Sequence, residues 1–335
     1  MTKKKEIDRL RESAGRIKVG DGSDGAITGM MTISNRLYII KEKAIYVIAM
    51  ADEIDPKRTR ADIPNMQQIV VDAGSGSEIV RRILLTAREL FRKDRLLEPI
   101  DWNAVLIAAL ELLRDVLAAQ EIAEEYAANK RAAEAKVTPP EDRAFRLPAV
   151  PGIEARMKSF IQKADHACQT IFNMCALFYS EAEMRSAGKW LDGFANVIKA
   201  RHAANAQFIK FSTALAEFGK LIRNTRHCIE HPKTTQRIEL RDYQLTADRR
   251  LEEPTIQVIH DATPIDKIAL EQFMSVIVGQ LLDGIETLMA YLAAMHMKPF
   301  GKIPTMVGEI PGGQRKDGVR FGYLVNIGGE WHKLT

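Results

Sequence analysis

One apolar helical seam, which ends in a charged stretch, constrains this chain more than any other feature. Its hydrophobic residues recur every three or four positions and so share one face of a helix: Phe208, Phe211, Leu215, Phe218 and Ile222. Four positions further on, the same face reaches Arg226, where another hydrophobic residue is expected. An inward-facing charge is unfavourable unless it is paired or lines a cleft. The seam therefore predicts a packed helix that carries a site in its last turns.

The stretch from Leu221 to Pro232 concentrates reactive side chains as no other part of the sequence does. Its polar and charged residues are the candidates for a functional site: Arg223, Asn224, Arg226, His227, Glu230 and His231. In an ideal helix, Arg226 and His231 would lie about 140° apart around the axis. Pro232 disfavours helical geometry at the residue before it. We therefore expect His231 to leave the helix and to be free to turn inward.

Helical periodicity elsewhere predicts a mainly α fold. The expected architecture is a helical bundle with a small inserted β-hairpin at about 235–260 and a short β-rich C-terminal tail. Ala26 to Ala51 is predicted to be a largely apolar helix, and Thr263-Pro264 is predicted to start another. We expect a mobile N-terminal arm, an N-terminal helical domain, a Pro-rich linker, a helical bundle with the hairpin, and a Gly-rich tail with a β-hairpin, at residues 1–25, 26–137, 138–152, 153–298 and 299–335.

A Gly-rich loop, Asp72 to Ser77, precedes a segment with helical spacing, Glu78 to Lys93. Such a loop can bind phosphate through free backbone N–H groups. However, the Lys-Ser/Thr pair of a phosphate-binding loop is missing, and so is a Gly-x-Gly-x-x-Gly run. The favoured alternative is an ordinary turn with Ser77 as the helix cap.

The composition indicates a globular cytoplasmic protein. The 335 residues are 46% hydrophobic and 27% charged, and the net charge of +4 permits a nucleic-acid partner without demanding one. The N-terminus is too charged to lead into an export segment, and the apolar run from Ile27 to Ala49 carries too many charges to span a membrane. The cysteines lack the spacing of a disulfide framework, and we expect reduced thiols at Cys168, Cys175 and Cys228. Cys168 and Cys175 share an apolar helix face, which predicts core packing.

Arg226 and His231 are separated by four residues, with the polar His227 directly after the arginine. This pattern resembles the Arg-x4–6-His motif of HEPN-domain proteins (higher eukaryotes and prokaryotes nucleotide-binding), and the resemblance covers roughly residues 152–298. It implies a metal-independent ribonuclease or an RNA-binding module of a stress or defence system, without a cofactor. It also implies a homodimer that pairs two such motifs.

The chemistry of RNA cleavage suits these residues. RNA carries its own nucleophile, the 2′-OH, so the protein must supply an acid or base and a cation near the phosphate. By this hypothesis His231 is the acid/base, because histidine changes its charge near neutral pH. Arg226 would be the phosphate clamp, since an arginine fork can hold two phosphate oxygens. His227 would orient one of them, and the supporting residues would be Glu230, Asn224 and Arg223.

A second interpretation concerns zinc. His227-Cys-Ile-Glu-His231 matches His-x-x-Glu-His, the inverted zinc-peptidase motif, in which two histidines hold the metal and Glu230 activates water. Pro232 ends the helix at the second ligand and loosens the geometry that the metal requires. A third ligand is not identified, and the candidates are Glu286 and Glu309. We therefore expect no metal here.

A third interpretation is structural. Arg226 and Glu230 can form an ion pair four positions apart, and histidines near a helix C-terminus complement its dipole. Arg223 and Asn224 would then be surface residues or would cap the following hairpin. The protein would in that case be a non-catalytic scaffold. Its N-terminal helical domain would offer a surface to a protein partner, because the helical segment from Gln120 to Lys136 has little to bury.

Overall fold

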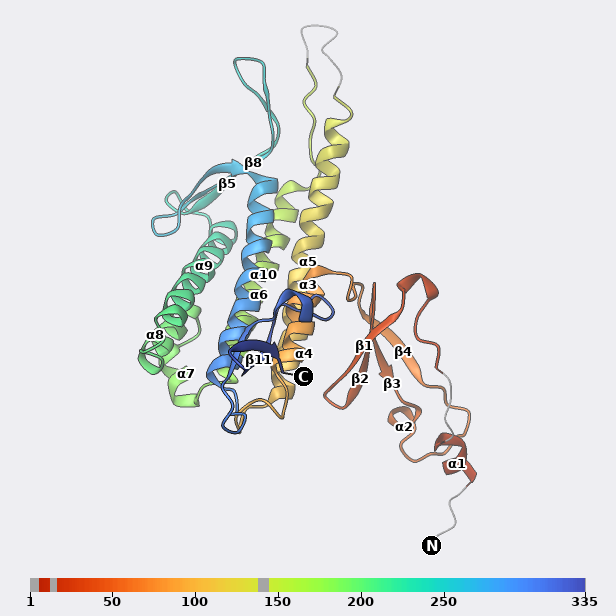
Figure 1. Cartoon of the computed structure of the whole chain (residues 1–335). Coiled ribbons are helices and arrows are strands. Elements are labelled where there is room, and N and C mark those ends of the chain that lie inside the picture. Colours follow the sequence, from red (N-terminus) through yellow and green to blue (C-terminus); the bar gives the residue numbers. More distant parts are fainter. Residues whose placement is uncertain (1–5, 13–16, 138–144, 335) are drawn as a thin grey trace. The chain divides into compact units, whose positions relative to one another are not determined.

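The computed structural model describes residues 6–12, 17–137 and 145–334, and it shows a mixed α/β protein (Figure 1). The protein is 49% helical and 20% strand, and the described residues form four separate sheets of two to four strands. The prediction of a mainly α fold with one small hairpin is therefore wrong. Parts of the predicted N-terminal arm and linker, namely 1–5, 13–16 and 138–144, lie outside the described residues.

Two compact units make up the chain, and each combines segments that are far apart in the sequence. Unit 1 comprises residues 1–95, 102–107 and 300–335, and unit 2 comprises residues 96–101 and 108–299. The short elements of unit 1 are α1 (Glu6–Glu12), η1 (Gly22–Asp24), α2 (Ala51–Ile54) and η3 (Gly312–Gln314).

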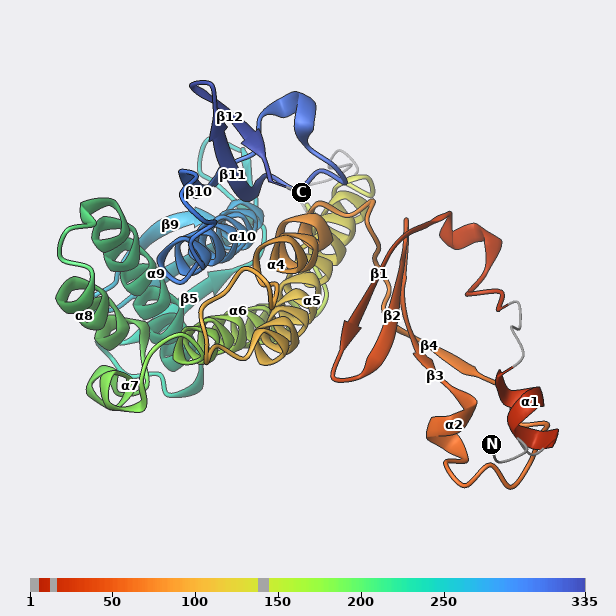
Figure 2. The same ribbon diagram turned by 60° about the horizontal axis from the view of Figure 1, so that its bottom comes forward.

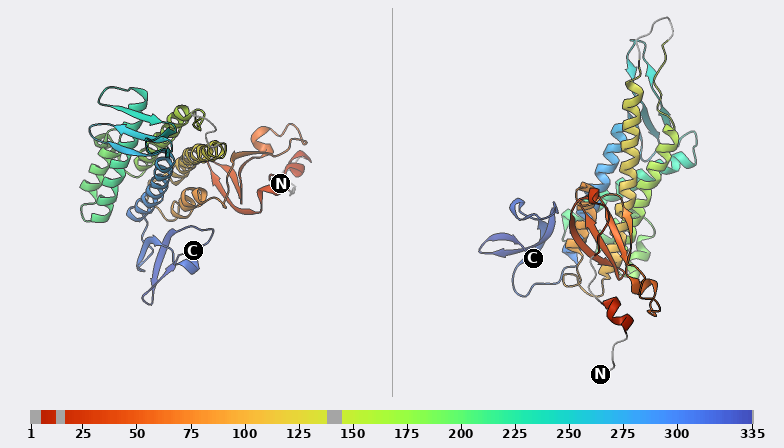
Figure 3. Two further views of the ribbon diagram at one scale, coloured as in Figure 1. Left: turned by 90° about the horizontal axis from the view of Figure 1, so that it is seen from above. Right: turned by 90° about the vertical axis from the view of Figure 1, so that its right-hand side faces the viewer.

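The main sheet of unit 1 is a four-stranded antiparallel meander, drawn in red and orange in Figure 3. Its strands are β1 (Ile27–Ile33), β2 (Arg36–Lys41), β3 (Ile45–Ala49) and β4 (Met66–Val71). The helix predicted from Ala26 to Ala51 is thus three strands. Ser34 and Asn35 both have positive φ (50° and 61°), and they close a two-residue turn in which Ile33 pairs with Arg36. Isoleucine is frequent in this run, and β-branched residues favour strands over helices.

The C-terminal tail of unit 1 forms a small sheet (Figure 2). Its strands are β10 (Thr305–Glu309), β11 (Phe321–Ile327) and β12 (Glu330–Lys333). The hairpin predicted in the tail is confirmed, because β11 pairs with β12 around Gly328 and Gly329, which both have positive φ. The same unit contains a helical segment in three stretches: α3 (Glu78–Val80), a π-helical turn η2 (Arg81–Leu85) and α4 (Thr86–Leu90). The Tyr323 hydroxyl of β11 donates to the Leu90 carbonyl at 2.6 Å and ties the tail sheet to α4.

The backbone amides of the Gly-rich loop before α3 donate hydrogen bonds to other backbone groups of the protein. Ser75 N and Gly76 N donate to the carbonyls of Lys41 and Glu42 at 2.9 and 2.8 Å, and Ser77 N donates to Gly74 O. These amides are therefore not free to bind phosphate, and the alternative of an ordinary turn holds. Ser77 does occupy the N-cap position, but its side chain makes no capping hydrogen bond.

Four long helices build unit 2: α5 (Trp102–Glu134, of which residues from 108 on belong here), α6 (Ile153–Ala176), α9 (Ala206–Glu230) and α10 (Leu270–Met295). Two shorter helices, α7 (Glu181–Ala187) and α8 (Leu191–Arg201), precede α9. Lys163 of α6 pairs with Asp115 of α5 at 3.0 Å, and Phe160 of α6 meets Phe273 of α10 edge-on. Cys168, Cys175 and Cys228 are buried free thiols, which confirms the predicted core packing of the first two.

A β-insertion follows α9. Its strands are β5 (Arg237–Arg241), β6 (Gln244–Leu245), β7 (Leu251–Glu252), β8 (Thr255–Ile259) and β9 (Ile265–Ala269). The predicted hairpin is confirmed by the antiparallel pairing of β5 with β8. The helix expected to start at Thr263-Pro264 begins only at Leu270, because β9 first pairs with β8.

Helix α10 is long and apolar enough to cross a membrane by length and composition. Of its most apolar window, 67% is buried inside this protein. Its buried face includes Phe273, Ile277, Leu281 and Leu288. Burial of this kind is typical of the central helix of a packed core.

Candidate functional site

The end of α9 lies where the sequence predicts it. The helix extends to Glu230, and the amide of His231 still donates to the carbonyl of His227 at 2.9 Å. His231 itself has φ −136° and ψ 60°, which is outside the helical region. Pro232 explains this geometry, since its ring disfavours helical backbone at the preceding residue. Of the predicted seam, Phe208, Leu215 and Ile222 are buried, whereas Phe211 and Phe218 are half-buried.

Arg226 is held by two carboxylates. Its Nη1 donates to Asp165 of α6 at 2.5 Å, and its Nε donates to Glu230 at 3.1 Å. The Asp165 side chain is only 1% exposed, whereas that of Arg226 is 34% exposed. Burial acts to lower the pKa of Arg226, but the ion pair with Asp165 raises this pKa overall. The inward-facing charge is therefore paired, and the arginine fork predicted to clamp a phosphate is largely engaged by protein groups.

Asp165 has a second hydrogen bond, from Gln169 Nε2 at 2.5 Å on the next turn of α6. Glu230 likewise receives a hydrogen bond from Gln162 Nε2 at 3.4 Å. Although burial acts to raise the pKa of Glu230, the Gln162 hydrogen bond and the charge of Arg226 lower it. Arg226, Asp165 and Glu230 thus form one network that joins the end of α9 to α6.

The two histidines are accessible. His227 and His231 are both exposed, and their ring centroids are 5.0 Å apart with 58° between the ring planes. The hydrogen bonds of Arg226 go to Asp165 and Glu230 rather than to either histidine. The structure therefore brings the histidines together, while Arg226 belongs to the buried side of the same helix end.

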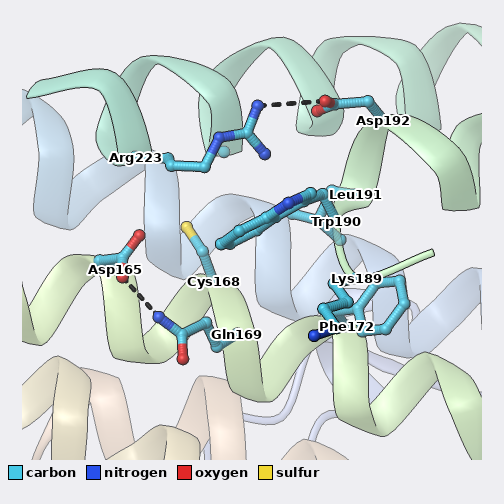
Figure 4. A pocket seen from close by; sticks show the side chains of 10 residues that line it. Asp165, Cys168, Gln169, Phe172, Lys189, Trp190, Leu191, Asp192 and Arg223 are labelled. Carbon is cyan, nitrogen blue, oxygen red and sulfur yellow. Dashed lines mark hydrogen bonds and ion pairs between the residues drawn. The ribbon is translucent and has the colours of Figure 1, made fainter. Parts of the chain in front are cut away.

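Arg223 and Asn224 point to other partners. Arg223 Nη2 donates to Asp192 at 3.1 Å, and its guanidinium lies 4.5 Å from the centre of the Trp190 ring (Figure 4). Asn224 Nδ2 donates to Thr263 Oγ1 at 3.1 Å, in the loop between β8 and β9. Both residues thus connect α9 to neighbouring segments of unit 2.

A small pocket lies between α6, the start of α8 and α9. Figure 4 shows the Trp190 ring between the Arg223 guanidinium and α6, with Asp165 and Gln169 nearby. The space accessible to water is about 10 Å³, which is room for about one water molecule. This pocket is too full to hold a substrate.

A larger open cleft of about 760 Å³ lies beside the charged stretch. Its lining comes from the start of α6, the end of α9 and strand β5, and it includes Lys158, Cys228, Pro232 and Arg241. Its cations are accompanied by two acids, Glu154 and Glu239. The cleft is large enough for a nucleotide-sized ligand next to the end of α9.

Sequence reasoning missed Asp165, although a signal was present. Asp165 interrupts the apolar face of α6 between Ile161 and Cys168, just as Arg226 interrupts the seam of α9. Opposite charges at inward positions of two neighbouring helices are expected to form an ion pair. Lys158 and Arg241 carry no comparable signal, because exposed basic residues are common on helices and edge strands.

The zinc interpretation finds no third ligand. No group of three or more His, Cys, Asp or Glu side chains that could hold a metal ion occurs within residues 6–12, 17–137 and 145–334. Of the two candidates, Glu286 is buried within α10 at 1% exposure, and Glu309 belongs to unit 1 whereas the histidines belong to unit 2. His227 and His231 alone do not form a zinc site, which needs three protein ligands or more.

No protein-family model, no curated protein and no solved structure matches this chain. The resemblance to HEPN-domain proteins therefore stays a prediction that rests on Arg226, His227 and His231.

Proposed function

We propose that the exposed end of α9 is the active centre of a metal-independent ribonuclease of HEPN-like type. The observation that carries this proposal is the pair of exposed histidines, His227 and His231, with ring centroids 5.0 Å apart. They lie next to an arginine whose position is fixed by the buried Asp165. A homodimer, as the resemblance implies, would present two such centres, and we expect it to lie in the cytoplasm.

The reaction requires two proton transfers. One histidine removes the proton of the ribose 2′-OH, the 2′-oxygen attacks the phosphorus, and the bond to the 5′-oxygen of the next nucleotide breaks. The other histidine protonates that leaving oxygen, so the products are a 2′,3′-cyclic phosphate and a 5′-OH. We assign one of these two proton transfers to His231 and the other to His227.

Arg226 has a different role from a free clamp. Its bonds to Asp165 and Glu230 make it a positioning residue, which fixes the turn that carries His231. Contacts to the RNA phosphates then fall to cations that line the neighbouring cleft: Lys158, and Arg241, whose side chain stays 49% exposed although it pairs with Glu239 at 3.2 Å. Their long side chains can follow a flexible single strand.

The test is cleavage of a labelled single-stranded RNA in the presence of EDTA. The wild type should cleave, and His231→Asn and His227→Asn should each lose at least about a hundredfold in rate, because positioned acid–base groups contribute about that much. His166→Asn is the matched control, since His166 is another exposed histidine, on α6. Loss of activity in all three variants, or none in any of them, would reject the assignment.

A second candidate is a non-catalytic scaffold, and the internal partners of three predicted site residues favour it. Arg223, Asn224 and Arg226 each contact another segment of unit 2. On this hypothesis no RNA cleavage occurs at any protein concentration. Arg226→Ala then lowers the free energy of unfolding and has no other effect. The same assay, combined with thermal melting, separates the two candidates.

A further inference from the structure

A second charged region lies in unit 1. An open cleft of about 520 Å³ is lined by two segments that are distant in the sequence. One is the turn after β4 with the following helix, and the other is the loop between β10 and β11. The lining residues are Ser75, Glu78, Arg81, Arg82, Arg315, Asp317, Gly318 and Arg320.

Arginine dominates this lining, with four guanidinium groups against two carboxylates. Arg81 Nη1 donates to the carbonyls of Ser75 and Gly76 at 3.1 and 2.9 Å, and within the described ranges it has no carboxylate partner. Its charge is therefore held in place by neutral groups. Arg315 is oriented by Glu309 at 2.7 Å and by the carbonyl of Ile310 at 2.9 Å.

The two acids of the lining are already engaged by arginines. Glu78 accepts from Arg82 at 3.3 Å, and Asp317 pairs with Arg88 at 3.5 Å. Each acid is also well exposed, with 66% and 43% of its side chain accessible. Together with Glu309, which pairs with Arg315 at 2.7 Å and lies 4.0 Å from Arg320, these carboxylates weaken the positive field of the cleft without reversing it, because the four arginines still outnumber the three acids.

The loop between β10 and β11 packs against the side chain of Arg81. Asp317 and Gly318 have positive φ, 54° and 70°. A Cβ atom at Gly318 would lie 2.6 Å from Arg81 Cδ and 2.8 Å from its Nε. Glycine thus lets the backbone pack directly on the arginine side chain, which restricts Arg81 before any ligand arrives. A restricted group loses less conformational entropy when it binds.

We propose that this cleft binds a small polyphosphorylated anion through its phosphate groups. Guanidinium groups match phosphate oxygens in pairs, and several of them around one cleft suit a ligand with several phosphates. The lining contains no aromatic and no large aliphatic residue, so the phosphates rather than an apolar ring provide recognition. The cleft also falls in the size range of small-molecule sites. This site is independent of the ribonuclease proposed for unit 2.

The test is isothermal titration of the full chain with inorganic tripolyphosphate, orthophosphate and sulfate at about physiological ionic strength. Tripolyphosphate should bind, and the two smaller anions should bind at least about tenfold more weakly. Arg315→Gln and Arg81→Gln should each weaken tripolyphosphate binding by about tenfold or more, as expected when a charge-assisted hydrogen bond is lost. Arg60→Gln is the matched control in the same unit, because Arg60 is 66% exposed and pairs with Asp62.

Thermal melting of each variant shows whether unit 1 stays folded. Should Arg81→Gln unfold it, Arg320→Gln provides the second test, since Arg320 reaches the cleft from the opposite segment. Equal binding of all three anions, or equal loss in Arg60→Gln, would mean non-specific charge attraction and would overturn the proposal. A variant that loses affinity for a single-stranded RNA but not for tripolyphosphate would also overturn it, in favour of a nucleic-acid surface.

Discussion

Substitution of Arg226 by alanine tests the network at the end of α9. The change leaves Asp165 buried at 1% exposure, with its bond from Gln169 but without its cation. Breaking a fully buried ion pair by removing one partner costs about 3–5 kcal/mol. Because the Arg226 side chain is 34% exposed, water can reach the carboxylate after the change, and we expect about 2–3 kcal/mol instead.

Hydrogen exchange of the amides in α6 and α9 measures this loss within unit 2 itself. Arg250→Ala is the control, because Arg250 is 85% exposed and pairs with Asp248 on the surface, where a substitution costs under about 0.5 kcal/mol. In the double variant Asp165→Asn/Arg226→Ala the buried charge of Asp165 is removed together with its partner. It should therefore be more stable than the sum of the single effects predicts, by about 1–2 kcal/mol. Strict additivity, or a loss below about 1 kcal/mol in Arg226→Ala, would show that the Arg226–Asp165 ion pair does not stabilise this helix end.

Two further predictions concern other parts of the chain. His296 is 4% exposed, and its ring packs against Phe178 and Tyr179. Burial lowers the pKa of His296 from 6.5. The stabilisation that the buried neutral ring provides is therefore complete above pH 6.5 and is lost as the pH falls through the lowered pKa. The free energy of unfolding should hence fall more steeply between about pH 7 and 5 in the wild type than in His296→Gln, as measured by urea titration; equal slopes would contradict the assignment. Gly74→Ala should destabilise unit 1 by about 1–3 kcal/mol, because the new Cβ would lie 2.0 Å from the Lys41 carbonyl oxygen. Gly22→Ala, which has open space around it, should leave the melting temperature unchanged.

Local sequence patterns predicted several elements, because hydrophobic spacing and the backbone preferences of single residues determine them. The seam from Phe208 to Ile222 required a helix, and Pro232 ended it at the expected place. The turn at Gly328 and Gly329 required a hairpin, since both residues adopt positive φ. Such features depend on spacing and on the preferences of single residues.

Strands β1 to β3 were missed because their apolar residues are too dense to show one period clearly. Met31 and Ile33 of β1 are buried at alternate positions, but the residues on either side of Lys41-Glu42-Lys43, Leu37 to Ile40 and Ala44 to Ile48, are continuously apolar. Such a run fits a buried helix as well as a buried strand. Only the pairing of three strands around the Ser34-Asn35 turn decides between them.

By itself, the sequence determined which helix carries the charged stretch, where that helix ends, and that Arg226 faces inward. The tertiary structure alone decided that Arg226 meets Asp165, 61 residues away, and that the two histidines remain exposed. It also decided that arginines from residues 81–82 and 315–320 line one cleft. Periodicity reports which face of an element is buried, but it does not report what that face meets, because contacts between distant segments depend on how the elements pack.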